Sequence, residues 1–169
     1  MKPKFTVTSD FTKDFNDVVK SFKRDAVLVG IPETDTSRKA DETGQGDEIN
    51  NATLLAINNF GSPAHNIPAR PVMAIGIRNA QEQIAEQFKL ATKNALSKGM
   101  QALYTYYERA GIIASVAVKK AINSQEGIKE PADSTLVARK AAGFKGTKAL
   151  LVTGQMRNAI TYVVNKGGL

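Results

Sequence analysis

Apolar residues recur along the chain with two different spacings, which predict short strands and longer helices. Apolar and polar residues alternate over 4–8, and β-branched residues fill 26–31, so both segments are predicted strands, and Pro32 ends the second. Between them, apolar residues lie three and four apart, which predicts a helix over about 10–24 with one apolar face. The residues of that face are Phe11, Phe15, Val18, Val19 and Phe22.

Helical spacing returns in the middle of the chain. A helix is predicted over 49–60, with Leu54, Ile57 and Phe60 on one face and Gly61 closing it. Two longer helices are predicted near 78–97 and 100–122, with Gly99 between them. The apolar stripe of the second is rich in small residues, which favour close approach of another element. This stripe comprises Leu103, Tyr107, Ala110, Ala114, Ala117 and Ala121.

The C-terminal third predicts shorter elements. Ser134 and Thr135 are expected to cap a short helix that Gly143 closes, and Thr153 is expected to cap a single turn over 154–158. Residues 159–164 alternate as a strand. We therefore expect an α+β fold in one domain of residues 1–169, with 165–169 as a tail. A small mixed or antiparallel sheet (4–8, 26–31, 159–164, with a possible further strand from 40–50) packs against two or three helices.

Two segments break the periodic pattern. Residues 32–48 hold six acids, two bases and two glycines, which predicts a long mobile acidic loop, either functional or simply solvated. Residues 60–71, F-G-S-P-A-H-N-I-P-A-R-P, contain three prolines and the only histidine of the chain. Proline disfavours helical geometry in the residue before it, which here is Ser62, Ile67 or Arg70. We therefore expect a stiff, non-helical strap, and residues 60–71 are called the strap below.

Charge is unevenly distributed along the 169 residues. Residues 1–64 carry a net charge of −2 and residues 65–169 a net charge of +9, and six basic residues but no acid follow Ser134. Such asymmetry fits contact with a nucleic acid or with a complementary copy of the same chain. The absence of cysteine excludes disulfides and thiolate zinc sites and is consistent with a reducing compartment. We find neither a secretory signal nor a stretch of about 20 apolar residues that could cross a membrane.

Known catalytic patterns are missing from the sequence. His65 is the sole histidine and lies in a proline-bounded loop, where a surface or packing role is the commoner one. The acids of 32–48 do not have EF-hand spacing, and no glycine pair has the spacing of a P-loop. We therefore expect no catalytic residue, no metal site and no cofactor, and a protein that is not an enzyme.

Three blocks in order resemble a known family. They are I-N-N-F-G-S-P-A-H-N-I-P-A-R-P-V-M at 57–73, T-L-V-A-R-K at 135–140 and L-L-V-T-G-Q-M-R-N-A-I-T-Y-V-V at 150–164. Together they resemble the tail-completion and neck proteins of long-tailed bacteriophages, also called virion morphogenesis proteins, over about 49–164. The chain departs from the family pattern at Asn58 and Asn59, where His or Glu is frequent, and at Val72, where Phe is frequent.

The resemblance implies a structural role in the virion. It predicts assembly in the bacterial host cytoplasm into a ring around the DNA path at the head–tail junction, next to connector and tail proteins. A ring needs two different patches on each subunit. The expected partner or subunit interface comprises Gly61, Pro68, Arg70, Pro71 and Met73. The expected contacts with DNA or an acidic partner are Arg139, Lys140, Lys145, Lys148 and Arg157.

Several alternatives remain open at the level of sequence. Arg70, fixed between two prolines, is either an interface anchor or the partner of an acid in its own subunit. The basic C-terminal third is either a phosphate-contacting surface or a solvated face. For the whole protein, the alternatives are a tail terminator or tail-tube component, a standalone DNA- or RNA-binding protein, and a small enzyme with an unmarked site.

Overall fold

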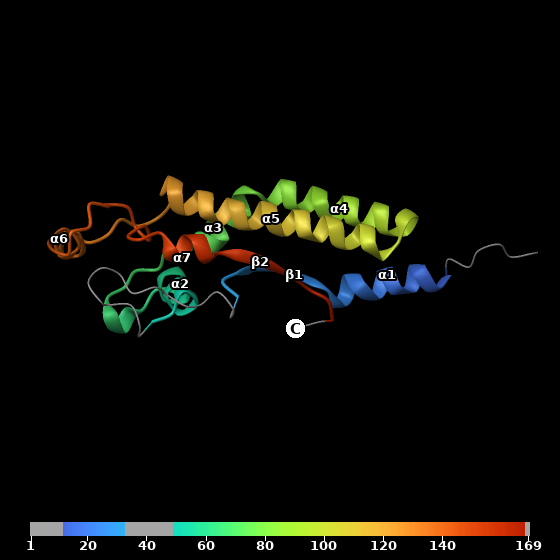
Figure 1. Ribbon diagram of the computed structural model, residues 1–169, viewed down its shortest axis with the longest axis horizontal. Coiled ribbons are helices and arrows are strands. Elements are labelled where there is room, and N and C mark those ends of the chain that lie inside the picture. Colours follow the sequence, from blue (N-terminus) through green and yellow to red (C-terminus); the bar gives the residue numbers. More distant parts are fainter. Residues whose placement is uncertain (1–11, 33–48, 168–169) are drawn as a thin grey trace, which may run out of the picture.

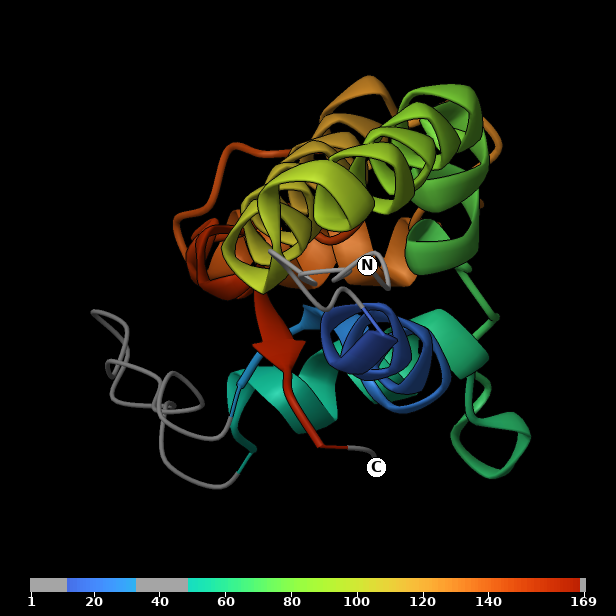
Figure 2. The same ribbon diagram turned by 90° about the vertical axis from the view of Figure 1, so that its right-hand side faces the viewer.

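The computed structural model describes residues 12–32 and 49–167. In these ranges the chain forms seven α-helices, one short 3-10 helix and a two-stranded sheet, which confirms the α+β class. The molecule is elongated, and α4 (Gln81–Lys98) and α5 (Met100–Ser124) form a long hairpin along one side of it (Figure 1). Seen end-on, the hairpin covers a second layer that contains the strands and α1 (Figure 2).

The sheet joins the early and late parts of the described chain. β1 (Ala26–Gly30) pairs antiparallel with β2 (Thr161–Asn165), with Ala26 opposite Asn165 and Gly30 opposite Thr161. Val27 and Val29 pack against the two hydrophobic cores, whereas Leu28 and its cross-strand neighbour Val163 are exposed on the other face. Two strands near 26–31 and 159–164 are thus confirmed, while the predicted strands at 4–8 and within 40–50 lie outside the described residues.

Helix α5 is the central element. It contacts α4, α3 (Val72–Asn79) and both strands. Two glycines permit these contacts: a Cβ added at Gly76 would lie 2.5 Å from Cα of Val118, and one at Gly111 would lie 2.2 Å from Cδ2 of Tyr162. The predicted small-residue stripe is therefore confirmed as a surface of close approach. Of its members only Ala117 is not buried, and the fully buried Val118 and Ile122 extend the contact surface.

Two hydrophobic cores lie along α5. The first gathers α2 (Asn51–Phe60), α3 and the C-terminal half of α5 around α7 (Gln155–Ala159), and includes Leu55, Val72, Val118, Ile122, Met156 and Ile160. The second joins α1 (Thr12–Arg24) to α4 and to the N-terminal half of α5, and includes Val18, Ala91, Ala95, Leu103 and Tyr107. Apolar burial of this extent is the main stabilising contribution to the fold.

The predicted apolar face of α1 is buried only in part. Val18 and Ser21 point into the protein, whereas Phe15, Val19 and Phe22 are 54%, 37% and 38% exposed. The spacing predicted the helix itself correctly. The apolar residues of α1 cover more of its circumference than the helices it packs against, so only part of the apolar face is buried. Phe11 lies outside the described residues. Helix α1 therefore leaves an apolar stripe of three residues, four and three apart, on the surface.

Other predicted boundaries also change. The helix predicted near 78–97 is confirmed as α4, but a further helix that was not predicted precedes it: α3 begins at Val72, directly after Pro71, and Ala80 (φ −109°, ψ 9°) separates it from α4. The predicted cap of α6 (Asp133–Ala141) is wrong: Ala132 occupies the cap position. Gly61 and Gly99 do end α2 and α4 as expected, each with φ near +80°. Phe60, predicted to share one face with Leu54 and Ile57, is 79% exposed, whereas Leu55 is buried.

Candidate functional site

The strap folds into a compact loop rather than an extended connection. Ser62 and Ile67 exchange two main-chain hydrogen bonds of 2.8 and 3.0 Å, and the prediction of a non-helical segment is wrong at Pro63–His65, which form a single 3-10 turn. Proline suits this turn because its fixed φ matches the first helical position. At Gly61 (φ +79°), an added Cβ would lie 2.7 Å from the amide nitrogen of Ala69. The tight loop therefore requires glycine at this position.

His65 closes this loop. Its Nδ1 lies 2.9 Å from Oγ of Ser62, and both side chains belong to the exposed end of the strap. The imidazole thus stabilises the turn locally.

Arg70 is built into its own subunit. Only 8% of the residue is exposed, its Nε donates to the carbonyl oxygen of Lys129 at 2.8 Å and its Nη2 to that of Glu130 at 3.2 Å. Its backbone N–H donates to the carbonyl of Asn58 at 2.8 Å. Arg70 therefore links α2, the strap and the 129–131 segment. Among the described residues its side-chain partners are main-chain carbonyls, and no acid pairs with it there.

The other predicted interface residues differ in accessibility. Pro71 is exposed, whereas Gly61, Pro68 and Met73 are partly buried, and Met73 packs against the first core. The backbone N–H of Met73 donates to Oδ1 of Asn59 at 3.2 Å, so an asparagine of α2 supports the start of α3. The five predicted residues lie close together in sequence and mainly connect elements of one subunit.

A half-open cavity of about 1020 Å³ lies beside the strap. It is called the strap cavity below, and its walls come from α2, the strap, the 129–135 segment, α6 and residues 149–156. Arg70 and Arg139 both line it. Burial lowers the pKa of each arginine, and the nearby charge of Arg139 lowers that of Arg70 further. The cavity therefore brings together Pro68 and Arg70 of the predicted interface set with Arg139 of the predicted basic set.

The predicted basic contacts divide into two groups. The first group forms one hydrogen-bond network at the end of α5 and comprises Arg139, Lys148 and Arg157. Two of these side chains bind Asn123: Nζ of Lys148 donates to its carbonyl oxygen at 2.8 Å, and Nη1 of Arg157 donates to its Oδ1 at 2.9 Å. Nη1 of Arg139 then donates to the carbonyl oxygen of Lys148 at 2.9 Å. Cations near a helix C-terminus are stabilising because they meet its unpaired carbonyls. Lys140 and Lys145 are exposed.

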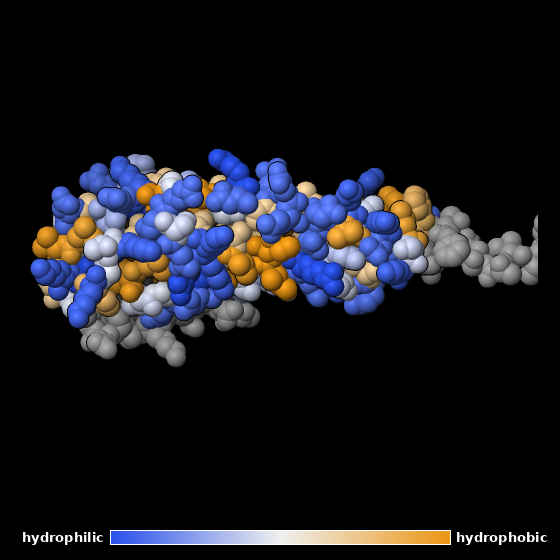
Figure 3. All heavy atoms as spheres, turned by 90° about the horizontal axis from the view of Figure 1, so that it is seen from above, coloured by the Kyte–Doolittle hydropathy of each residue, from blue (hydrophilic) through white to orange (hydrophobic). Residues whose placement is uncertain are grey.

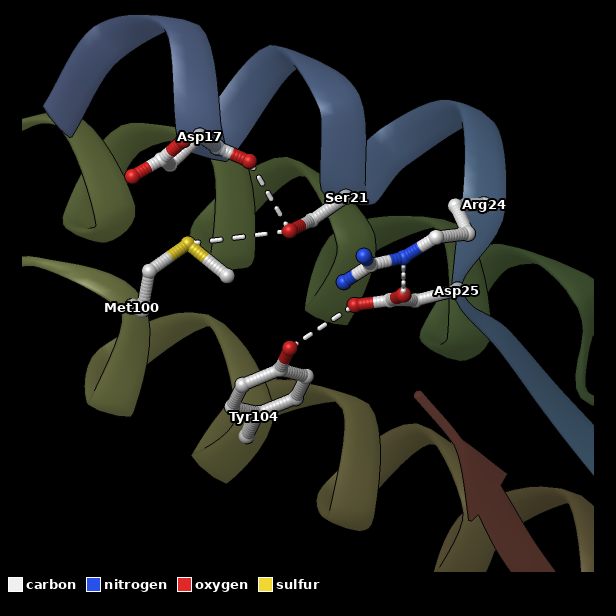
Figure 4. A network of polar contacts seen from close by, with 6 residues as sticks. All are labelled: Asp17, Ser21, Arg24, Asp25, Met100 and Tyr104. Carbon is white, nitrogen blue, oxygen red and sulfur yellow. Dashed lines mark hydrogen bonds and ion pairs between the residues drawn. The ribbon is translucent and has the colours of Figure 1, made fainter. Parts of the chain in front are cut away.

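Sequence reasoning missed a polar network between α1 and α5 (Figure 4). The side chain of Asp25 has no exposed surface, and it accepts hydrogen bonds from Tyr104 Oη at 2.8 Å and from Arg24 Nε at 3.0 Å. Beside it, Oγ of Ser21 donates to the carbonyl of Asp17 and contacts Sδ of Met100 at 3.7 Å. No spacing rule could have connected Asp25 with Tyr104, which lies on another helix.

Opposing effects set the pKa of Asp25. Burial by itself raises the pKa of this carboxyl group. Hydrogen bonds lower it, and they come from Tyr104, from Arg24 and from the backbone of Gly167. With the positive charge of Arg24, these bonds leave the pKa below its usual value. Burial raises the pKa of Tyr104, and its bond to Asp25 raises it further. Lys166 Nζ lies 4.0 Å from the centre of the Tyr104 ring. The network thus fixes α1, α5 and the end of β2 together.

Apolar side chains also reach the surface of the helical hairpin. Seen from the hairpin side, orange patches interrupt a largely hydrophilic surface (Figure 3). Ile112 and Val116 of α5 are exposed and line a second, smaller hollow of about 450 Å³.

Within the described ranges, we found no group of three His, Asp or Glu residues placed to hold a metal ion. None of the helices described there combines the length and apolarity needed to cross a bilayer. No family model, curated protein or solved structure matches the chain.

Proposed function

We propose that the protein is a non-enzymatic structural component of a bacteriophage virion, which acts in assembly at the head–tail junction as a neck or tail-completion protein. The proposal starts from the three motif blocks at 57–73, 135–140 and 150–164. In this proposal, copies form a ring around the DNA path, between connector and tail proteins. A tail terminator or a tail-tube component is the nearest alternative, since assembly is the function there too.

The observation that carries the proposal is the apolar stripe on α1. Phe15, Val19 and Phe22 are exposed on one helix, which lies at one end of the elongated molecule (Figure 1). Two aromatic side chains on one exposed helix face favour a protein contact, because each buries a large apolar area on association. The exposed Leu28–Val163 pair on the open face of the sheet adds a further apolar surface.

A ring made of identical subunits joins two different patches of neighbouring copies. In the proposed assembly, the apolar stripe of α1 supplies one patch, and elements at the other end of the molecule supply the second. Lys140 and Lys145, which are exposed on and after α6, would face the phosphates of the genome or an acidic neighbour.

The test is the solution mass of the purified chain, measured by light scattering, alone and after mixing with candidate connector and tail proteins of the same phage. We expect a defined oligomer, or a complex of fixed stoichiometry with one of these proteins, and ring-shaped particles in negative-stain electron microscopy. A chain that stays monomeric with every candidate and is missing from purified virions would refute the proposal.

Standalone nucleic-acid binding is a second candidate, favoured by the run of six basic residues without an acid after Ser134. It requires tight binding of duplex DNA or RNA by the isolated chain, with affinity falling steeply as salt rises. Replacing Lys140 and Lys145 by Gln should then weaken binding. It should also reduce the slope of log affinity against log salt concentration by about one for each phosphate that is no longer bound. Unchanged binding would leave these lysines as a solvated face.

A further inference from the structure

The strap cavity is large enough for a peptide. Small-molecule sites usually span about 300–1,000 Å³. At about 1020 Å³ the strap cavity is at the upper limit of that range, and it is open on one side. Its bounding elements α2, α6 and α7 gather at the end of the molecule opposite α1 (Figure 1). An occupant can therefore enter without passing the apolar stripe of α1.

Among the described residues, two arginines of this cavity form no ion pair with an acid. The ion pairs formed among the described residues are Arg24–Asp25 and Lys89–Glu86, and neither involves Arg70 or Arg139. Arg70 donates through Nε and Nη2 to carbonyl oxygens, and Arg139 donates through Nη1 alone. Within the described part of the chain, nitrogen atoms of both guanidinium groups thus remain without a hydrogen-bond acceptor.

A charge held away from water is costly unless an opposite charge meets it. Arg70 is almost fully buried, and burial lowers its pKa, as expected for a cation short of compensation. An entering carboxylate would offset this cost, and arginine binds carboxylates through two parallel N–H donors. The electrostatics of the cavity therefore favour an anionic group on its occupant.

The rest of the lining distinguishes between possible anions. Ile67, Pro68, Leu150, Val152 and Met156 give the cavity apolar walls. Glu130 and Asp133 line it too, and their negative charge disfavours a continuous row of phosphates. A peptide can place one carboxylate at the arginines and aliphatic side chains against the apolar walls, whereas a nucleic-acid backbone carries a repeated phosphate charge and no aliphatic side chains.

We propose that the strap cavity is the docking site for an acidic segment of a partner protein, in which an Asp or Glu carboxylate binds Arg70 and Arg139 and flanking aliphatic side chains contact the apolar walls. This inference does not depend on ring formation or on a head–tail role, so the two proposals can fail separately.

The experiment uses the full chain and two peptide libraries. In one library, each acetylated and amidated octapeptide carries a single Asp or Glu flanked by Leu, Ile or Val. In the matched library, Asn or Gln replaces the acid. We expect the acidic library alone to yield binders, with dissociation constants of about 10⁻⁶–10⁻⁴ M by fluorescence anisotropy. Arg139→Gln should weaken the binding of a selected peptide by about tenfold or more, because it removes one of the two cations that bind the carboxylate of the peptide.

Arg78→Gln is the matched control, since Arg78 is an exposed arginine of α3, carries the same charge as Arg139 and does not line the cavity. We expect it to leave peptide binding unchanged. Thermal unfolding by circular dichroism checks that each variant folds. A selected peptide carrying a photo-crosslinker gives a second measurement that needs no variant, and we expect it to label residues 65–68 or 129–135.

Five results would overturn the proposal. The first four are a lack of binders in the acidic library, equal enrichment of the neutral library, peptide binding that is insensitive to Arg139→Gln, and crosslinks confined to other surfaces. The fifth is binding of a duplex oligonucleotide that displaces the peptide and depends on Arg139 but not on Arg78, which would assign the arginines to a nucleic acid.

Discussion

The hydroxyl of Tyr104 donates a 2.8 Å hydrogen bond to the buried carboxylate of Asp25, two residues that lie 79 positions apart in the sequence. This contact joins the end of α1 to the first half of α5. Because Arg24 and the backbone of Gly167 also bind Asp25, one carboxylate connects three segments of the chain.

Tyr104→Phe tests this connection. The change removes one hydrogen bond and leaves part of the buried carboxylate unsatisfied, so we expect a loss of about 1–3 kcal/mol in the free energy of unfolding. Urea denaturation measures it. Tyr106→Phe is the matched control: the Tyr106 ring stacks on Arg109, 5.0 Å from its centre, and Phe keeps that stacking. Equal effects of the two changes would argue against a special role for Tyr104.

Asp25 also predicts a pH dependence. Its pKa in the folded protein lies below the value of about 3.9 for an unfolded aspartate, so the unfolded state binds the proton more tightly. The ionised carboxylate contributes its full stabilisation of the folded state at pH values above the unfolded-state pKa. This contribution is lost as the pH falls through the folded-state pKa. Asp25→Asn should therefore be less stable than the native chain at pH 6, with the difference shrinking below about pH 4. A difference that is constant from pH 6 to pH 3 would contradict this.

Gly76→Ala tests the close approach of α3 and α5. The new Cβ would lie 2.5 Å from Cα of Val118, a backbone atom that cannot move without shifting the helix. We expect a loss of about 1–3 kcal/mol, or more, by thermal or urea unfolding. Gly30→Ala serves for comparison because a Cβ there would meet nothing within 4 Å. Similar stability of both variants would show that the helices can separate freely.

The apolar stripe of α1 makes a prediction about association. Replacing Phe15 and Phe22 together by Gln should leave the stability of the monomer within about 0.5 kcal/mol, because both side chains are exposed. The same change should weaken self-association or partner binding by about tenfold or more, since it removes two aromatic contacts. Analytical ultracentrifugation measures this, with Lys20→Gln, an exposed polar change on α1, as the control. Unaltered association would exclude the stripe as the interface.

Arg70→Ala separates the two roles of that residue. Losing the guanidinium leaves the carbonyls of Lys129 and Glu130 without their donor, and we expect a loss of about 1–3 kcal/mol in the free energy of unfolding. Arg78→Ala, an exposed arginine of α3, should cost much less. If Arg70 also anchors an interface, Arg70→Ala will impair virion assembly at temperatures where the variant is folded. Normal assembly there would leave Arg70 with an internal role alone.

Sequence spacing located most helices correctly because α2, α4 and α5 have apolar residues at helical intervals and glycines at their ends. It did not identify α3, since Gly76 interrupts the apolar pattern at the point where α5 passes closest. The inward face of α1 was predicted only in part: Val18 belonged to the predicted face, but the burial of Ser21 and the exposure of Phe15 depend on where α4 and α5 lie.

The candidate site was only partly predictable for the same reason. Arg70 and Arg139 were each singled out from the sequence, but the cavity that they share forms from segments brought together by the first core. Tertiary contacts of this kind leave no periodic signal.

The pairing of β1 with β2 has a consequence for the order of folding. During synthesis, α3, α4 and α5 leave the ribosome consecutively and can pack through local contacts, whereas β1 must wait until β2 has been made. The exposed edge of β1 is therefore open to wrong partners for most of translation. Pulse-labelling hydrogen exchange during refolding should show protection of α5 amides before those of β1, and simultaneous protection would contradict this sequence of events.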